Sequence, residues 1–207
     1  ETTFGGDNYI YQGNPAFNCP DALAANAAEA GYDMFLTSNN HSGDTMGDGI
    51  IRTLEVSQEA GLDTLGSQMP GEKRYSIIEV NGIKIGMVSY TWAFKINGDG
   101  SFSLNGLMAV KDEGQMNFFT KANPDKLYKE VEPLMEEMKA EGAEATMIFL
   151  HWGEEYDLRG NAAQQKMAQK LCDMGFDVIV GGHPHVVQPV ALLESTVDPG
   201  HKTVCIY

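Results

Sequence analysis

The sequence contains few basic residues. Of its 207 residues, 14 are lysine or arginine and 29 are aspartate or glutamate, which gives a formal net charge of −15 at pH 7. Lysine and arginine do not gather into a basic run anywhere along the chain. Because nucleic acids and anionic membrane surfaces bind clustered positive charge, the sequence argues against both classes of partner.

Long apolar runs and cysteine patterns are also missing. No apolar stretch approaches the ~18 residues of a transmembrane helix, and the N-terminus does not resemble a signal peptide. The three cysteines, Cys19, Cys172 and Cys205, are widely spaced and odd in number, which indicates neither a disulfide framework nor a zinc ribbon. We expect all three to be packing residues.

The composition is typical of a globular domain. Hydrophobic residues make up 43% of the chain and charged residues 21%, so we expect a packed core and one domain over residues 1–207. The chain begins at Glu1 and ends at Tyr207, inside an apolar, strand-like run. We therefore expect a fragment truncated at both ends, which is itself soluble.

Helical and strand patterns alternate along the chain. Helices are predicted over 20–30, 48–60, 124–141 and 161–174, and strands over 33–38, 62–65, 75–80, 83–90, 144–150, 177–180, 186–194 and 203–207. Asn81 and Gly82 join two of these strands in a hairpin of type I′. The pattern predicts an α/β fold with a mixed sheet.

Two segments depart from this alternation. Pro133 is expected to kink or divide the helix that contains it. Residues 92–122 have no clean period and carry Gly98, Gly100, Gly106 and Gly114, which predicts an irregular excursion near the edge of a site. Function and simple flexibility explain the excursion equally well.

Four of the five histidines, and one asparagine, directly follow predicted strands. These residues are Asn40, His41, His151, His183 and His185. Because α/β folds gather their sites at strand ends, the placement predicts a functional site.

Each of these positions also has a plain structural interpretation. In an extended backbone the imidazoles of His183 and His185 would point the same way and suit two nearby metal ions; the alternative is a turn with incidental histidines. Asn40 offers a hard oxygen donor that completes a metal site. The alternative for Asn40 and His41 is an Asx turn that closes the strand.

Three further residues follow His151. Trp152 is expected to form a wall of the pocket. Glu155 either reaches the site or lies solvated in a loop, and Tyr156 either contacts substrate or packs. His201 follows Pro199 and Gly200 in an expected solvent turn and is left out of the site.

Three blocks occur together in the order seen in a known family: Ser38-Asn39-Asn40-His41, His151-Trp152-Gly153-Glu154-Glu155-Tyr156 and Gly181-Gly182-His183-Pro184-His185-Val186-Val187-Gln188. They resemble the CapA-type proteins of bacterial poly-γ-glutamate capsule synthesis, a branch of the calcineurin-like metallophosphoesterase superfamily. The resemblance covers nearly the whole chain. It implies a four-layer αββα sandwich with mixed sheets and a two-metal site at the strand ends.

The resemblance also implies roles for individual residues. It makes His41 the catalytic residue that protonates the leaving group, and it implies these metal ligands: Glu1, Asn40, His151, His183 and His185. Trp152, Glu155 and Tyr156 would bind substrate. The family's first, aspartate-bearing motif would lie before Glu1, and its C-terminal block is cut at Tyr207.

The function implied by the resemblance is hydrolysis of phosphoester bonds with two divalent ions, Mn, Fe or Zn. Its substrate would be an anionic polymer or a small phosphorylated molecule, and capsule-synthesis membrane proteins would be partners. The alternative is a non-catalytic accessory protein of exopolymer assembly that keeps the scaffold. The resemblance places the protein at the cell surface or on a membrane, anchored through a missing N-terminal segment.

Overall fold

A computed structural model describes residues 1–107, 110–111 and 115–207. The chain forms two compact units. The first unit comprises Glu1–Arg74 and Thr91–Ala122, and the second comprises Tyr75–Tyr90 and Asn123–Tyr207.

The first unit is built on a short βαβ connection. Strand β1 (Met34–Leu36) leads into helix α2 (Met46–Glu59), which returns the chain to β2 (Asp63–Leu65), and β1 and β2 pair in parallel. Helix α1 (Ala22–Glu29) precedes them, after a short 3₁₀ turn, η1 (Gly6–Asn8). An apolar cluster joins these elements through Phe4, Ala24, Val56 and Leu62.

The predicted irregular excursion has more order than its glycines indicate. Strands β5 (Lys95–Ile96) and β6 (Phe102–Ser103) pair antiparallel, and β7 (Phe118–Thr120) pairs in parallel with the end of β4 (Ile83–Ala93). Apolar burial explains this order, because a second cluster of the first unit is drawn largely from the excursion: Ile50, Ala93, Phe102, Leu104, Val110, Met116 and Phe118. Gly114 lies outside the described residues.

The second unit is built on a mixed sheet whose strand order is β10-β11-β9-β8-β4-β3. Its further strands are β3 (Ser76–Val80), β8 (Ala145–His151), β9 (Val178–Gly182), β10 (Val190–Glu194) and β11 (Lys202–Ile206). β8, β9 and β11 pair in parallel, whereas β3 with β4 and β10 with β11 pair antiparallel. The predicted α/β class with a mixed sheet is confirmed.

The predicted hairpin is also confirmed. Val80 pairs with Ile83, and the two residues between them have φ values of 52° at Asn81 and 82° at Gly82. Positive φ at both central positions is the requirement of a type I′ turn.

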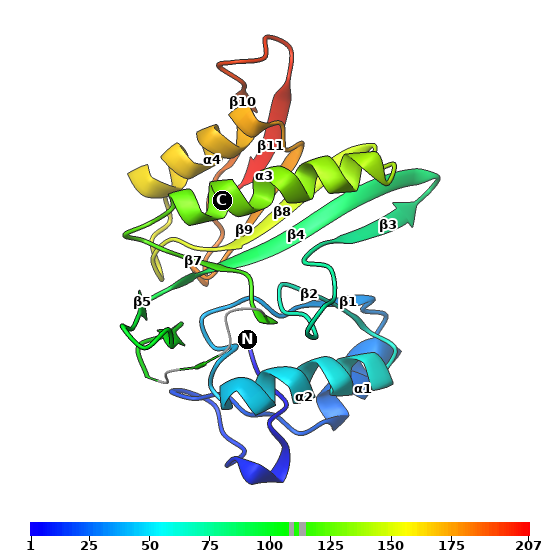
Figure 1. Ribbon diagram of the computed structural model, residues 1–207, viewed down its shortest axis with the longest axis vertical. Helices are drawn as coiled ribbons and strands as arrows, with labels where there is room; N and C mark the ends of the chain where they lie inside the picture. Colours follow the sequence, from blue (N-terminus) through cyan, green and yellow to red (C-terminus); the bar gives the residue numbers. More distant parts are fainter. Residues whose placement is uncertain (108–109, 112–114) are drawn as a thin grey trace. The chain divides into compact units, whose positions relative to one another are not determined.

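Helices α3 (Asp125–Ala140) and α4 (Ala162–Met174) cover one face of the second unit's sheet (Figure 1). α4 begins with a capping box between Asn161 and Gln164 and ends at Gly175, whose φ is 95°. Pro133 lies inside one continuous α3, so the predicted division of this helix is wrong. The helix continues because burial of Leu127, Val131, Met135 and Met138 offsets the backbone hydrogen bond that proline removes.

The sequence expectations about membrane-spanning helices and cysteines can be compared with the residues that the structure describes. Within them no helix is long and apolar enough to cross a bilayer. Cys19, Cys172 and Cys205 are free thiols, and the latter two are buried, which agrees with their expected packing role.

Candidate functional site

The first candidate region is the turn between β1 and α2, residues 37–45, called here the His41 turn. Asn39 Oδ1 accepts a hydrogen bond from the His41 backbone N–H at 2.9 Å, which is an Asx turn. Ser42 Oγ accepts from the Asn39 N–H at 2.9 Å and donates to the Thr37 carbonyl at 2.6 Å. Local side-chain hydrogen bonds therefore fix the backbone that carries His41.

The imidazole of His41 is held by Asp44, a residue that the sequence reasoning missed. His41 Nδ1 lies 2.7 Å from Asp44 Oδ2, and the side chain of Asp44 is 1% exposed. The carboxylate accepts from Nδ1–H, which leaves Nε2 as the nitrogen available for proton transfer. The available signal was an aspartate three residues after a histidine in a turn.

Phe17 and Glu1 complete the surroundings of His41 within the first unit. The Phe17 ring meets the imidazole edge-on with centroids 4.4 Å apart, and its backbone N–H donates to Asp44 Oδ2 at 2.7 Å. Glu1 Oε2 lies 3.9 Å from His41 Nε2. Asn40, predicted as a metal ligand, is buried in the same turn.

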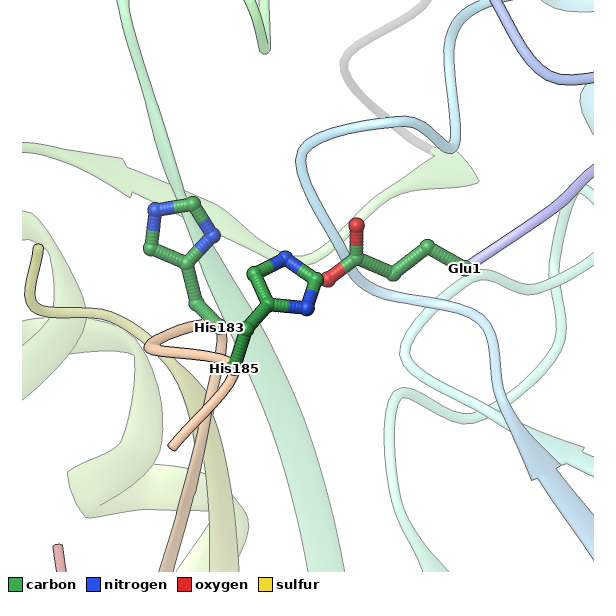
Figure 2. A group of neighbouring side chains, drawn as sticks. All are labelled: Glu1, His183 and His185. Atoms are coloured by element: carbon green, nitrogen blue, oxygen red, sulfur yellow. The ribbon is translucent and has the colours of Figure 1, made fainter. Parts of the chain in front are cut away.

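The second candidate region lies in the second unit, where β8 and β9 end together. Their parallel register sets His151 opposite Gly182, and this brings the ring of His151 to 4.8 Å from that of His183, centroid to centroid. The rings of His183 and His185 are 6.1 Å apart, and Figure 2 shows them side by side on the turn after β9. The structure thus gathers three of the predicted ligands. Glu1, also labelled in Figure 2, belongs to the first unit.

The backbone of this turn, His183-Pro184-His185, is not extended as one sequence interpretation required. φ is 93° at His183 and 57° at His185, because β9 ends at Gly182 and the chain reverses there. Left-handed φ at a non-glycine residue costs of order 1–3 kcal/mol and persists only where the surroundings impose it. Here the Tyr156 N–H donates to the Pro184 carbonyl at 2.7 Å, and the Trp152 N–H donates to the Gly182 carbonyl at 3.1 Å.

The residues predicted to bind substrate have different surroundings. Tyr156 is 71% exposed and its ring stacks over His185 with centroids 6.1 Å apart. Glu155 is exposed. Trp152 is 2% exposed, and its ring stacks on that of Tyr207 with centroids 5.9 Å apart. Its side chain is therefore packed in the interior.

An open pocket of about 430 Å³ surrounds the His183–His185 turn, lined by Gly181, Gly182, His183, Pro184, His185, Val186, Val187 and Tyr207. Burial raises the pKa of the Tyr207 phenol to about 12, and burial likewise raises the pKa of the Cys205 thiol to about 12. Both groups are therefore uncharged at neutral pH. Of the two, Tyr207 alone lines the pocket, whose other polar side chains are His183 and His185.

The imidazoles of the second unit are of a ligand type that divalent transition metals prefer. Imidazole nitrogen is a preferred ligand of Zn, Cu, Fe and Ni, and His151, His183 and His185 bring three imidazoles to one strand end. His201 comes just before β11 rather than at the strand ends that carry the imidazoles, and its Nε2 lies 3.1 Å from the Phe176 carbonyl oxygen, which is the pattern of a structural histidine.

The chain resembles known proteins along its whole length. The family described as bacterial capsule synthesis protein PGA_cap matches residues 1–207. The capsule biosynthesis protein CapA of Bacillus anthracis is 32% identical over 163 residues, which is 77% of this chain and 36% of that protein. The PGA biosynthesis protein CapA of Bacillus subtilis (strain 168) is 29% identical over 169 residues, 80% of this chain and 40% of that protein. The chain therefore spans less than half the length of these curated relatives.

Proposed function

Because the chain belongs to the bacterial capsule synthesis protein family PGA_cap, we propose that it serves poly-γ-glutamate capsule biosynthesis as a metal-dependent hydrolase of phosphoester bonds. One observation carries the proposal: the imidazole of His151, at the end of β8, lies close to those of His183 and His185, which stand on a backbone turn with left-handed φ. Strain of this kind clusters at functional sites.

The metal-binding part of the proposal rests on the second unit. His151, His183 and His185 would hold divalent metal, with Mn, Fe and Zn as the fitting ions. Metal held there would activate water for attack at neutral pH and would offset the charge that develops on phosphoryl oxygens. Glu1 and Asn40 are proposed as further ligands on the family resemblance.

The proton-transfer part rests on the first unit. Asp44 holds the Nδ1–H of His41 at 2.7 Å, so a proton enters or leaves the ring through Nε2. A histidine that carries a proton on its free ring nitrogen can give that proton to a departing alkoxide. We propose this role for His41.

Charge limits the substrates. With a net charge of −15, the protein repels a polyanion over most of its surface, and attraction arises where bound cations reverse the local field. We propose a small phosphorylated substrate or the end of an anionic polymer. Trp152, Glu155 and Tyr156 are proposed to contact it, and capsule-synthesis membrane proteins at the cell surface are the proposed partners.

Hydrolysis of bis(p-nitrophenyl) phosphate tests the function. We expect turnover that ends with chelation and returns with Mn²⁺, and we expect His183→Ala to lower kcat/KM by at least ~100-fold, since metal ligands are needed for the whole metal-derived rate. His201→Ala, in the same unit, is the matched control and should retain the rate. Unchanged metal content and hydrolysis in His183→Ala would overturn the proposal. A chain that binds metal without turnover would serve as an accessory of polymer assembly instead.

A further inference from the structure

We propose that Asn105 is a positioning residue for the His41–Asp44 pair. The inference rests on the proposed function, because it assigns a role within proton transfer by His41. It also assigns a role to the irregular segment at residues 92–122, which contains Asn105.

The contacts of Asp44 show what Asn105 contributes. Oδ2 faces His41 Nδ1 at 2.7 Å and accepts from the Phe17 N–H at 2.7 Å. Oδ1 accepts from Asn105 Nδ2 at 2.5 Å. With a donor on each oxygen, the buried carboxylate cannot rotate about its Cβ–Cγ bond without losing a charge-assisted hydrogen bond.

The orientation of the Asn105 amide follows from a second contact. The Leu107 N–H donates to Asn105 Oδ1 at 2.9 Å, and a backbone N–H requires an acceptor there. The amide nitrogen must therefore face Asp44. The side chain is fixed at both ends and offers Asp44 a donor.

The excursion is itself anchored on the His41 turn. Leu104 and Val110 are 2% and 1% exposed, and a Cβ added at Gly43 would meet Val110 Cγ2 at 2.8 Å and Leu104 Cδ1 at 3.6 Å. Phe102 and Val110 exchange backbone hydrogen bonds of 2.8 and 2.7 Å. Core packing next to Asn105 therefore holds its amide at Asp44.

Two Asn105 variants test the inference. Asn105→Asp keeps the acceptor for the Leu107 N–H and removes the donor to Asp44, while Asn105→Ala removes both. Asn97→Asp is the matched control, since its amide lies in the same segment and donates to Ser101 Oγ at 2.8 Å. Melting temperature checks that each variant folds.

The first readout is independent of catalysis. In the ¹H–¹⁵N NMR spectrum, the Nδ1–H resonance of His41 should be downfield and protected in the wild type, and shifted or broadened by exchange in both Asn105 variants. It should be unchanged in Asn97→Asp. The second readout is turnover of bis(p-nitrophenyl) phosphate, where we expect a roughly 10-fold loss in kcat with KM within about twofold, as for a group that acts on geometry alone.

The outcomes separate the two proposals. A changed His41 resonance in the Asn105 variants supports the positioning role, even if the wild type shows no hydrolysis and the proposed function fails. Wild-type resonance and wild-type kcat in both variants would overturn the positioning role, even if the protein proves to be a hydrolase.

Discussion

The His41 turn and the His183–His185 turn both follow strand ends, yet they hold their histidines by different means. In the first, side-chain hydrogen bonds hold the histidine: those of Asn39 and Ser42 fix the backbone, and that of Asp44 fixes the ring. In the second, the backbone is held in left-handed φ, and neighbouring imidazoles lie close together with their rings tilted. An imidazole tied to a buried carboxylate has one nitrogen committed, which suits proton transfer, whereas clustered imidazoles suit a shared cation.

The largest effect should come from removing the second cluster. His183→Ala combined with His185→Ala should lower hydrolysis of bis(p-nitrophenyl) phosphate by ~1000-fold or more, because the metal-derived rate is lost. Steady-state kinetics with added Mn²⁺ measures it, with His201→Ala beside it. If the double variant were as active as His201→Ala, the His183–His185 turn would not supply the metal-derived rate, and the proposed difference between the two turns would be wrong.

The next effect concerns the committed nitrogen of His41. Asp44→Asn keeps the shape and removes the charge that orients the ring, so we expect kcat to fall about 100-fold, within the range of general acid–base contributions. Asp48→Asn is a matched control, since Asp48 is exposed and accepts from the Tyr9 hydroxyl at 2.8 Å. Equal kcat values in the two variants would count against the proton-transfer role.

The sequence predicted the elements well and the contacts less well. Periodicity and turn residues located α1, α2, α4 and the Asn81–Gly82 hairpin because those signals are local. The contact between Asp44 and Asn105 joins residues 61 positions apart, and no local pattern encodes it, whereas the His41–Asp44 pair is local and its spacing was a usable signal. The left-handed backbone at His183 was missed for a related reason: its support comes from Trp152 and Tyr156, on a different strand end.

The two glycines that precede the His183–His185 turn differ in how closely their surroundings are packed. A Cβ at Gly181 would collide with Trp152 Nε1 and with the Tyr207 backbone, whereas a Cβ at Gly182 meets its nearest atom, His151 Nδ1, at 3.9 Å. We expect Gly181→Ala to lower the free energy of unfolding by about 1–3 kcal/mol through overpacking, and Gly182→Ala to change it little. Urea unfolding of both variants checks this, and similar midpoints would contradict it.

Relief of strain should act in the opposite direction. His185 is exposed and has a φ of 57°, a conformation that glycine adopts without strain, so His185→Gly should raise the free energy of unfolding by about 0.5–1 kcal/mol while weakening metal binding. Thermal unfolding of the metal-free protein measures the first effect and metal titration the second. A destabilised variant would show that the turn is not strained.

The smallest effect lies far from both turns. Asp21 accepts two hydrogen bonds of 2.7 Å from Arg52, and these bonds hold the pKa of the Asp21 carboxyl below its ordinary value of 3.8. Because the carboxyl ionises more readily in the folded protein, its ionised form stabilises the fold at pH values above the ordinary pKa. This stabilisation is lost as the pH falls through the folded-state pKa. Asp21→Asn should therefore cost about 0.5 kcal/mol at pH 7, after allowance for solvent screening, and nothing in strong acid. Urea unfolding at both pH values measures the difference, and an equal cost at both would contradict the ion-pair explanation.

Metal content per chain, measured by elemental analysis, tests most directly the claim that the two turns do different chemistry. The account predicts bound Mn, Fe or Zn in the wild type, its loss from the His183→Ala, His185→Ala double variant, and its retention in Asp44→Asn. Equal metal content in all three proteins, or metal lost from Asp44→Asn and kept in the double variant, would contradict it.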